Sequence, residues 1–549
     1  MRVQLLVGCA TAGLLAAAGS AHAAAPCTPA GLNALGVADV NVTEAKPVAA
    51  TAQQPAYCQV LGTVVTRGGG APDGSARFSL QLPDAWKQRY LFVGVGGNAG
   101  NLQPSANGVD RAAALGKGYA MILTDTGHIG DGTTAKWVRK PDGSRDEAKV
   151  VDFFNRAAHN VSVAGKAFAQ AYYGAPVLHA YFDGCSTGGR MALVSAQQYP
   201  DDYAGIIAGD PAMDFKLALA RWAIQKAALR SPDGYMSPQL LEALDTRITA
   251  RCDAIDGAKD GMVQDPLACP VKPEDLRCKA GETKACLDAD QVKVLRAYLT
   301  PIRDRRGKIV YPNWPITNLF GRVGANSYTF GQTKPDITQA RPWGPDERAA
   351  PRGWELGHQS LSYWLGDGEA APIGKVDIDE NNVAGDALLA RFASYAPGDA
   401  TDPAKMKAFI DHGHKLILYH GSSDPSIPWQ RTIQFYNELA KQQGGFAKTQ
   451  SSVRFFLVPG MHHCGGGVGP DKFDTLSALE AWVEQGQAPA TIMASTLPDA
   501  PVQRNLPLCP YPAQARYNGK GELSDAANWS CKAPAAARKA KPAKAKAAV

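Results

Sequence analysis

The sequence lacks several features that mark large classes of protein. It has no Cys-x-x-Cys pair, which argues against a cysteine-rich metal site, and no apolar run beyond its N-terminal region long enough to cross a bilayer. Only 20% of its 549 residues are charged. The net charge is +6, and Arg2 with six basic residues in segment 532–549 exceeds it by one, so the rest of the chain carries −1. That segment has no acidic residue and is predicted to be a disordered tail. The remainder is nearly neutral, so we expect no nucleic-acid-binding face.

The one marked apolar stretch lies at the N-terminus. Arg2 precedes an apolar region over residues 5–18, and Ala21-His22-Ala23 provides a small-x-small cleavage site. The pattern predicts a signal peptide over residues 1–23 and an exported protein, either periplasmic or secreted. A membrane anchor is the alternative, but the run is too short to span a bilayer. A lipoprotein signal at Cys9 is disfavoured, because the apolar region follows this cysteine.

The number of cysteines is even once the predicted signal is set aside. Eleven cysteines include Cys9, so ten remain in the mature chain. An even number in an exported protein indicates disulfide bonds, although their spacing leaves many pairings open.

Short apolar runs alternate with helix-like segments up to about residue 213. Such alternation is typical of a mostly parallel sheet covered by helices. The alternation stops in a region rich in Pro, Gly, Cys and Trp, and it resumes with a strand at 415–420. We therefore predict an α/β fold with two core parts, 24–213 and 409–531, a large inserted lid domain over 214–408, and the tail over 532–549.

A Gly-x-Ser-x-Gly motif lies at Gly184–Gly188, between an apolar run at 177–182 and a helix-favouring run at 191–197. A serine on a strand-to-helix turn of this kind is the nucleophile elbow of an α/β-hydrolase. The glycines let the chain bend sharply and lift the hydroxyl of Ser186 clear of the sheet. An ordinary glycine-rich turn is the alternative, and the context of strand and helix favours the elbow.

An acid and a base follow in the chain order that this fold uses. Asp424 comes just after the strand that ends at His420, and His463 comes just after the strand that ends at Val458. Singly, Asp424 reads equally well as a turn residue and His463 as a surface histidine. Together with Ser186 they predict a catalytic triad, in which His462 is the alternative base.

Two cysteines adjoin the predicted triad. Cys185 precedes Ser186, and Cys464 follows His463. A disulfide between them, which favours His463 over His462, requires Cα atoms within about 7 Å. The predicted oxyanion hole consists of the N–H of Thr187 and an N–H from the Gly96-Gly97-Asn98 loop, for which we choose Gly97.

Three carboxylates lie close together in the insert, at Asp253, Asp256 and Asp260, with glycines at 257 and 261. Oxygen ligands of this kind suit Ca²⁺, although the spacing is not that of an EF-hand. We expect a structural calcium ion here; an acidic solvated turn is the alternative.

These motifs together resemble the tannase and feruloyl esterase family of α/β-hydrolases, which also includes an enzyme that hydrolyses mono(2-hydroxyethyl) terephthalate. The pairing of Cys185-Ser186 with His463-Cys464 is the most specific element. The resemblance implies that the carbonyls of Ala258 and Met262 complete the calcium shell. It also implies five disulfides: Cys27–Cys58, Cys185–Cys464, Cys252–Cys269, Cys278–Cys286 and Cys509–Cys531.

The substrates implied by the resemblance are small esters of aromatic acids. Nine aromatic residues lie between Tyr311 and Trp364, and some of them are expected to sandwich an aromatic acyl group, although most are expected to form the core of the lid. Ile427 is expected to border the pocket. An arginine that holds a second substrate carboxylate has no clear position, and Arg391 is the nearest candidate.

The sequence therefore predicts an exported serine esterase that acts through an acyl-enzyme and needs no organic cofactor. The alternatives are a mono(2-hydroxyethyl) terephthalate hydrolase-like activity, a serine peptidase with the same triad, and a non-catalytic calcium-stabilised binding protein on the same scaffold. The sequence does not indicate an oligomeric state.

Overall fold

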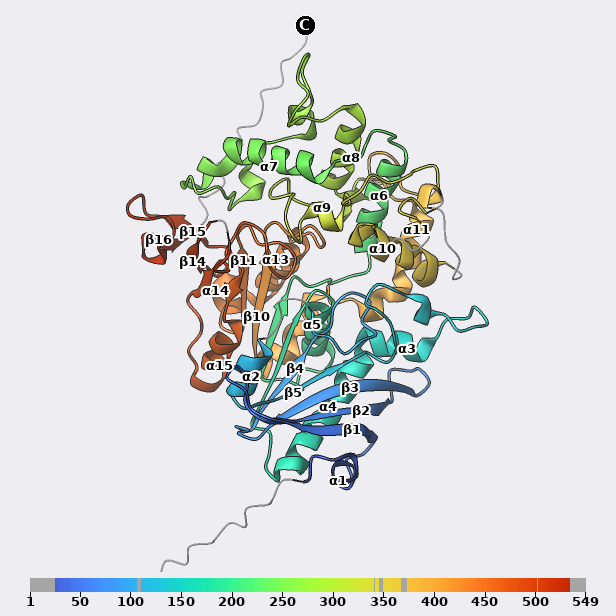
Figure 1. The fold of residues 1–549 in the computed structure, drawn as a ribbon, viewed down its shortest axis with the longest axis vertical. Coiled ribbons are helices and arrows are strands. Elements are labelled where there is room, and N and C mark those ends of the chain that lie inside the picture. The colour runs from blue at the N-terminus through green and yellow to red at the C-terminus, as the bar shows by residue number, and fades with distance from the viewer. Residues whose placement is uncertain are drawn as a thin grey trace, which may run out of the picture.

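The computed structural model describes residues 25–105, 110–339, 341–344, 349–366, 373–500 and 502–533 (Figure 1). The predicted signal peptide lies outside these residues, and so do residues 534–549 of the predicted tail. Lys532, where the sequence predicts the tail to begin, still belongs to a strand, β16 (Trp529–Lys532). Among the described residues, no helix is both long and apolar enough to cross a membrane.

A nine-stranded sheet lies at the centre, in the order β1-β2-β3-β5-β4-β6-β7-β10-β11. The pairs from β1 to β5 are antiparallel, and all pairs from β5 to β11 are parallel. The protein is thus an α/β-hydrolase with a mostly parallel sheet. The strands are β1 (Val40–Val48), β2 (Tyr57–Thr66), β3 (Gly74–Pro83), β4 (Arg89–Val93), β5 (Tyr119–Thr124), β6 (His179–Cys185), β7 (Gly205–Gly209), β10 (Lys415–Gly421) and β11 (Val453–Val458).

Helices cover both faces of the parallel strands, which is why these strands are apolar almost throughout. One core contains Phe92 and Phe182 of the sheet together with residues of α4, α5 and α13. The other contains Leu91 and Tyr181 with residues of α2 and α15. The helices outside the insert are α1 (Pro29–Asn33), α2 (Arg111–Gly116), α3 (Glu147–Val151), α4 (Ala157–Tyr173), α5 (Thr187–Gln198), α13 (Gln430–Gln443), α14 (Phe446–Thr449) and α15 (Thr475–Gln485).

A long insert connects β7 to β10 and consists mainly of short helices and irregular chain. Its helices α6 to α10 lie above the sheet in Figure 1, over the end that carries the start of α5. Its α-helices and strands are α6 (Leu217–Leu229), α7 (Pro238–Cys252), α8 (Ala289–Leu299), β8 (Ile302–Arg303), β9 (Ile309–Tyr311), α9 (Ala325–Tyr328), α10 (Arg352–Gln359), α11 (Asp386–Arg391) and α12 (Lys407–Asp411).

The C-terminal part adds two small sheets beside β11. One consists of β12 (Lys472–Phe473), β13 (Ile492–Ser495) and β14 (Asn505–Leu508), and the other of β15 (Gln514–Tyr517) and β16. Five disulfides join the described cysteines in the pairs that the resemblance implies: Cys27–Cys58, Cys185–Cys464, Cys252–Cys269, Cys278–Cys286 and Cys509–Cys531.

Candidate active site

Ser186 lies on a sharp turn between β6 and α5. Its φ of 64° and ψ of −123° are strained for a residue with a side chain. Only small neighbours permit this turn, because a Cβ atom on Gly184 would come within 2.6 Å of Gly188, and one on Gly188 within 3.0 Å of Gly94. The turn places the Ser186 hydroxyl at the carboxyl edge of the sheet, where it faces a cavity.

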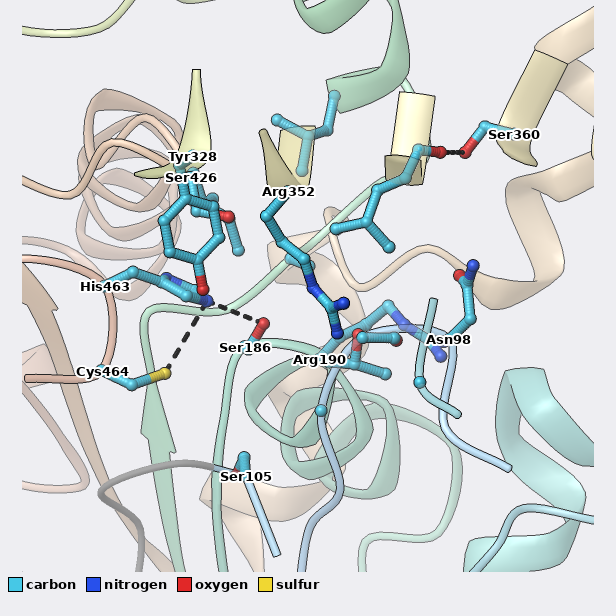
Figure 2. Close-up of a pocket in the computed structure, with 18 of the residues that line it drawn as sticks. Asn98, Ser105, Ser186, Arg190, Tyr328, Arg352, Ser360, Ser426, His463 and Cys464 are labelled. Atoms are coloured by element: carbon cyan, nitrogen blue, oxygen red, sulfur yellow. Dashed lines mark hydrogen bonds between the residues drawn. The ribbon is translucent and has the colours of Figure 1, made fainter. Parts of the chain in front are cut away.

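The hydroxyl of Ser186 meets the two side chains predicted to accompany it. Its Oγ lies 2.9 Å from Nε2 of His463 (Figure 2). Nδ1 of His463 lies 2.7 Å from Oδ2 of Asp424. His463 follows β11, and Asp424 follows β10, so three separate loops converge at the edge of the sheet. The order of the contacts allows a proton to pass from Ser186 to His463 while Asp424 holds the other ring nitrogen.

Asp424 is fully buried and remains ionised because neighbouring groups donate hydrogen bonds to its carboxylate. Its Oδ1 accepts hydrogen bonds from the N–H groups of Ser426 and Ile427. Burial alone would raise the pKa of Asp424, but the charge of His463 and the hydrogen bonds of the nearby imidazoles hold it below its usual value. For His463, burial lowers the pKa, but the charge and hydrogen bond of Asp424 outweigh this effect and raise it above 6.5.

The neighbouring His462 points elsewhere. It is fully buried, and its Nε2 lies 2.8 Å from the carbonyl oxygen of Asn318 in the insert. Of the two adjacent histidines, only His463 contacts Ser186 and Asp424, so the geometry favours His463 over the alternative base.

The base loop is fastened to the elbow by a disulfide and a buried carboxylate. The Cα atoms of Cys185 and Cys464 are 6.0 Å apart and their sulfurs are bonded. Asp210, at the end of β7, accepts hydrogen bonds from the N–H of Cys464 at 2.7 Å and from the N–H of Gly421 at 2.7 Å. Burial raises the pKa of Asp210 to about 6. No sequence motif pointed to Asp210, although its position directly after a buried strand is a usable signal.

The predicted oxyanion-hole residues lie next to each other. The hydroxyl of Thr187 donates to the carbonyl of Gly97 at 2.6 Å, which fixes the loop after β4 against the start of α5. Gly97 has a φ of 60°, and a Cβ atom there would lie 2.1 Å from the carbonyl oxygen of Gly132. The N–H of Asn98 is already bonded to that carbonyl at 2.8 Å. The N–H groups of Gly97 and Thr187 make no hydrogen bond within the described part of the chain.

A cavity of about 350 Å³ lies over Ser186 and His463. Its aromatic wall combines Phe153 before the elbow with Phe215, Tyr328 and Trp364 of the insert. The ring of Tyr328 stands edge-on to that of His463, with centroids 5.5 Å apart (Figure 2). Of the nine aromatic residues between Tyr311 and Trp364, only Tyr328 and Trp364 line this cavity.

Three arginines of the insert also line the cavity: Arg221, Arg322 and Arg352. In Figure 2 the guanidinium group of Arg352 points toward Ser186. The described residues place no carboxylate within salt-bridge distance of Arg221, whose guanidinium lies 3.4 Å from the Ser426 hydroxyl. Burial lowers its pKa to about 10, so it stays charged at neutral pH. Arg391 is exposed and does not line the cavity, whereas Ile427 lines it as expected.

Comparison with known proteins supports the assignment of the fold and of the enzyme class. The sequence profile of the tannase and feruloyl esterase family matches residues 58–532. The chain belongs to this family. Mono(2-hydroxyethyl) terephthalate hydrolase of Piscinibacter sakaiensis is 32% identical over 538 residues, with 89% of this chain and 87% of that protein covered. A probable feruloyl esterase of Arthroderma benhamiae is 30% identical over 461 residues, with 82% and 81% covered.

Solved structures of family members have the same fold. Feruloyl esterase B from Aspergillus oryzae superposes with a TM-score of 0.74 at 25% identity and covers 90% of this chain and 97% of its own. Tannin acyl hydrolase from Aspergillus niger gives a TM-score of 0.71 at 21% identity, with 93% and 96% covered. The family member described here is a carboxylic ester hydrolase.

The acidic loop of this family member lies after α7, away from the cavity. The carboxylate of Asp253 accepts the N–H groups of Asp260 and Gly261, and Asp260 forms a salt bridge with Arg504 at 3.2 Å. Burial and repulsion from Asp260 and Asp253 raise the pKa of Asp256 to about 6. Within the described residues, these three carboxylates do not form a group whose oxygens all lie within 4.8 Å of one another.

Proposed function

We propose that this protein is an exported serine esterase that hydrolyses esters of aromatic carboxylic acids through an acyl-enzyme. The single observation that carries the proposal is the continuous contact from Ser186 through His463 to Asp424 at the floor of an aromatic cavity. The names of its relatives, which include feruloyl esterases and a terephthalate monoester hydrolase, point to the same class of substrate.

In the first half-reaction, Oγ of Ser186 attacks the ester carbonyl carbon, and Nε2 of His463 takes the hydroxyl proton. The carbonyl oxygen becomes negative and is stabilised by the N–H groups of Gly97 and Thr187. His463 then gives its proton to the departing alkoxide, so the alcohol leaves and an acyl ester of Ser186 remains. Water repeats the sequence, and the aromatic acid is released.

The direct test is Ser186→Ala. Removal of the nucleophile is expected to lower kcat for methyl ferulate and methyl gallate by about 10⁶-fold and to abolish labelling by a serine-directed phosphonate. Ser451→Ala, which alters an exposed serine far from the cavity, is the matched control. Full activity in the Ser186→Ala protein with an unchanged circular dichroism spectrum would remove Ser186 from the mechanism.

A second candidate substrate class is the monoester of an aromatic dicarboxylic acid. The charged Arg221, without an acidic partner among the described residues, supports it, because a second carboxylate on the substrate would neutralise this cation. Arg221→Leu is then expected to lower kcat/KM for mono(2-hydroxyethyl) terephthalate by about 10- to 100-fold and to leave methyl ferulate within about threefold. An equal loss for both substrates would contradict this second candidate.

We further propose that the acidic loop holds a structural Ca²⁺. The chemistry of its donors supports this idea: Asp253, Asp256 and Asp260 crowd one loop, and the carbonyls of Ala258 and Met262 accept no hydrogen bond within the described part of the chain. A calcium ion would offset the burial and the repulsion between carboxylates that together raise the pKa of Asp256. Its role would be to stabilise the loop, without taking part in the reaction.

A chelator is expected to lower the Tm by several degrees, and added Ca²⁺ but not Mg²⁺ is expected to restore it. Asp256→Asn is expected to remove most of this response. A chelator-insensitive Tm in the wild-type protein would exclude the ion. Export is tested separately, by fractionation of cells that express the full chain and by N-terminal sequencing for cleavage after Ala23.

A further inference from the structure

A second histidine contacts the proposed catalytic acid, and the reaction scheme above gives it no role. His420 is the next-to-last residue of β10 and is fully buried. Its Nε2 lies 3.1 Å from Oδ2 of Asp424, the same oxygen that contacts His463. Nothing in the strand pattern singled out His420, because it occupies the end of an otherwise apolar run.

The partners of the ring determine its tautomer. Nε2 of His420 faces two acceptors, the carboxylate of Asp424 and the carbonyl of Ile427, each at 3.1 Å. This nitrogen therefore carries a hydrogen and donates it. Nδ1 lies 2.8 Å from the hydroxyl of Thr432 on α13, and the hydroxyl donates to it.

The consequence for Asp424 is a fully satisfied carboxylate. Its Oδ1 accepts two backbone N–H groups, and its Oδ2 accepts one N–H from each of two imidazoles. Without His420, Oδ2 would have only His463 as partner, and the carboxylate could rotate about its last bond. We propose that His420 is a positioning residue, which holds Oδ2 of Asp424 in line with Nδ1 of His463. This inference rests on the proposed function.

His420 also weakens the electrostatic effect of the Asp424 carboxylate on His463. The N–H of His420 binds part of the negative charge on Oδ2, so less remains to stabilise the protonated form of His463. The charged and titratable groups that face His420 among the described residues are Asp424 in its own loop, Asp210 at the end of β7, 3.6 Å away, and His463 beyond Asp424. Loss of the His420 donor is therefore expected to raise the pKa of His463.

The test compares His420→Leu, which removes the donor, with His420→Gln, whose amide N–H can still donate to Asp424. His420→Leu is expected to lower kcat about 10- to 100-fold with little change in KM, to slow phosphonate labelling of Ser186, and to move the acid limb of kcat/KM to higher pH. His420→Gln is expected to recover most of kcat. His412→Gln, an exposed histidine, is the control.

Thr432→Val provides a second measurement if the leucine variant does not fold. It removes the anchor of the ring and is expected to lower kcat about threefold to tenfold, whereas Thr432→Ser retains wild-type kcat. Equal losses in His420→Leu and His420→Gln, or wild-type kcat in folded His420→Leu or in Thr432→Val, would overturn the positioning role. If Ser186→Ala is inactive while these variants behave as wild type, only this inference fails; if Ser186→Ala is active, the proposed function fails.

Discussion

The carboxyl edge of the sheet and the insert above it contribute to one cavity in different ways. Ser186, Asp424 and His463 follow the parallel strands β6, β10 and β11, and their side chains are held by buried partners. The insert contributes Arg221 and Tyr328 from helices that have no sheet to fix their order.

The two regions differ in role: the sheet edge carries out the reaction, and the insert selects the substrate. At the sheet edge, the loops after β6, β7, β10 and β11 are joined to one another by the Cys185–Cys464 disulfide and by the hydrogen bonds of Asp210. The insert presents charge and aromatic surface to the substrate, and Tyr328 packs against His463, but the insert supplies none of the three residues of the Ser186–His463–Asp424 chain. Changes at the edge are therefore expected to act on kcat, and changes in the insert on the preference among substrates.

The largest effect is expected for Asp424→Asn at the edge. The amide keeps the shape of the side chain but presents the wrong donor pattern to Nδ1 of His463, so the imidazole no longer holds the correct tautomer. We expect a loss in kcat of about 10⁴-fold with KM within a few-fold. Steady-state kinetics on methyl ferulate measures it. A loss in kcat below tenfold would mean that the residues at the sheet edge do not catalyse the reaction.

A smaller effect is expected from the Gly97 loop, which lies against the start of α5 beside Ser186. In Gly97→Ala, the new methyl group would lie 2.1 Å from the carbonyl of Gly132, and the φ of 60° would be strained. The N–H of residue 97 must then move, and kcat is expected to fall about 10²- to 10³-fold. Gly96→Ala meets its nearest atom at 3.6 Å and is the matched control. Equal loss in both variants would argue against Gly97 as the oxyanion donor.

The sequence predicts the edge far better than the insert, for a physical reason. A parallel strand is a short apolar run, and the residue just after it must lie at the edge, so Ser186, Asp424 and His463 could be located without coordinates. The roles of His420 and Asp210 could not be predicted from the sequence, because a single buried polar residue at the end of a strand produces no periodic pattern. Strand β1 was also not predicted.

The walls of the cavity could not be predicted from composition. The concentration of aromatic residues between Tyr311 and Trp364 suggested a substrate sandwich, yet Tyr311 and Trp314 are buried in the core of the insert. Phe153 and Phe215, which do line the cavity, lie outside that window. Irregular chain has no fixed period, so nothing in its sequence says which ring turns toward the substrate.

Each of the two regions contains a disulfide, so the effect of removing one can be compared between them. Cys185–Cys464 closes a loop of 279 residues at the edge, and Cys278–Cys286 one of 8 residues in the insert. Replacement of both cysteines of one disulfide by serine is expected to lower the free energy of unfolding. The loss is up to about 5 kcal/mol for the pair at the edge and about 2 kcal/mol for the pair in the insert. Only the edge variant is expected to lose kcat, by about tenfold or more, because the base loop is released. Denaturant unfolding and kinetics of the two double variants test this contrast, and full activity in the edge variant would refute it.

The smallest expected effect is a shift in pH dependence that links the two regions. His463 must be neutral to accept the proton of Ser186, so kcat/KM is expected to rise with pH through the pKa of His463, which Asp424 raises above 6.5. The positive charge of Arg221 in the insert lowers the pKa of His463 and so opposes the effect of Asp424. Arg221→Leu is therefore expected to move the acid limb to higher pH by a few tenths of a unit. The profile is measured with methyl ferulate, a neutral substrate, and His412→Gln serves as the control. A limb that moves to lower pH in Arg221→Leu would show that the insert does not act on the base through its charge.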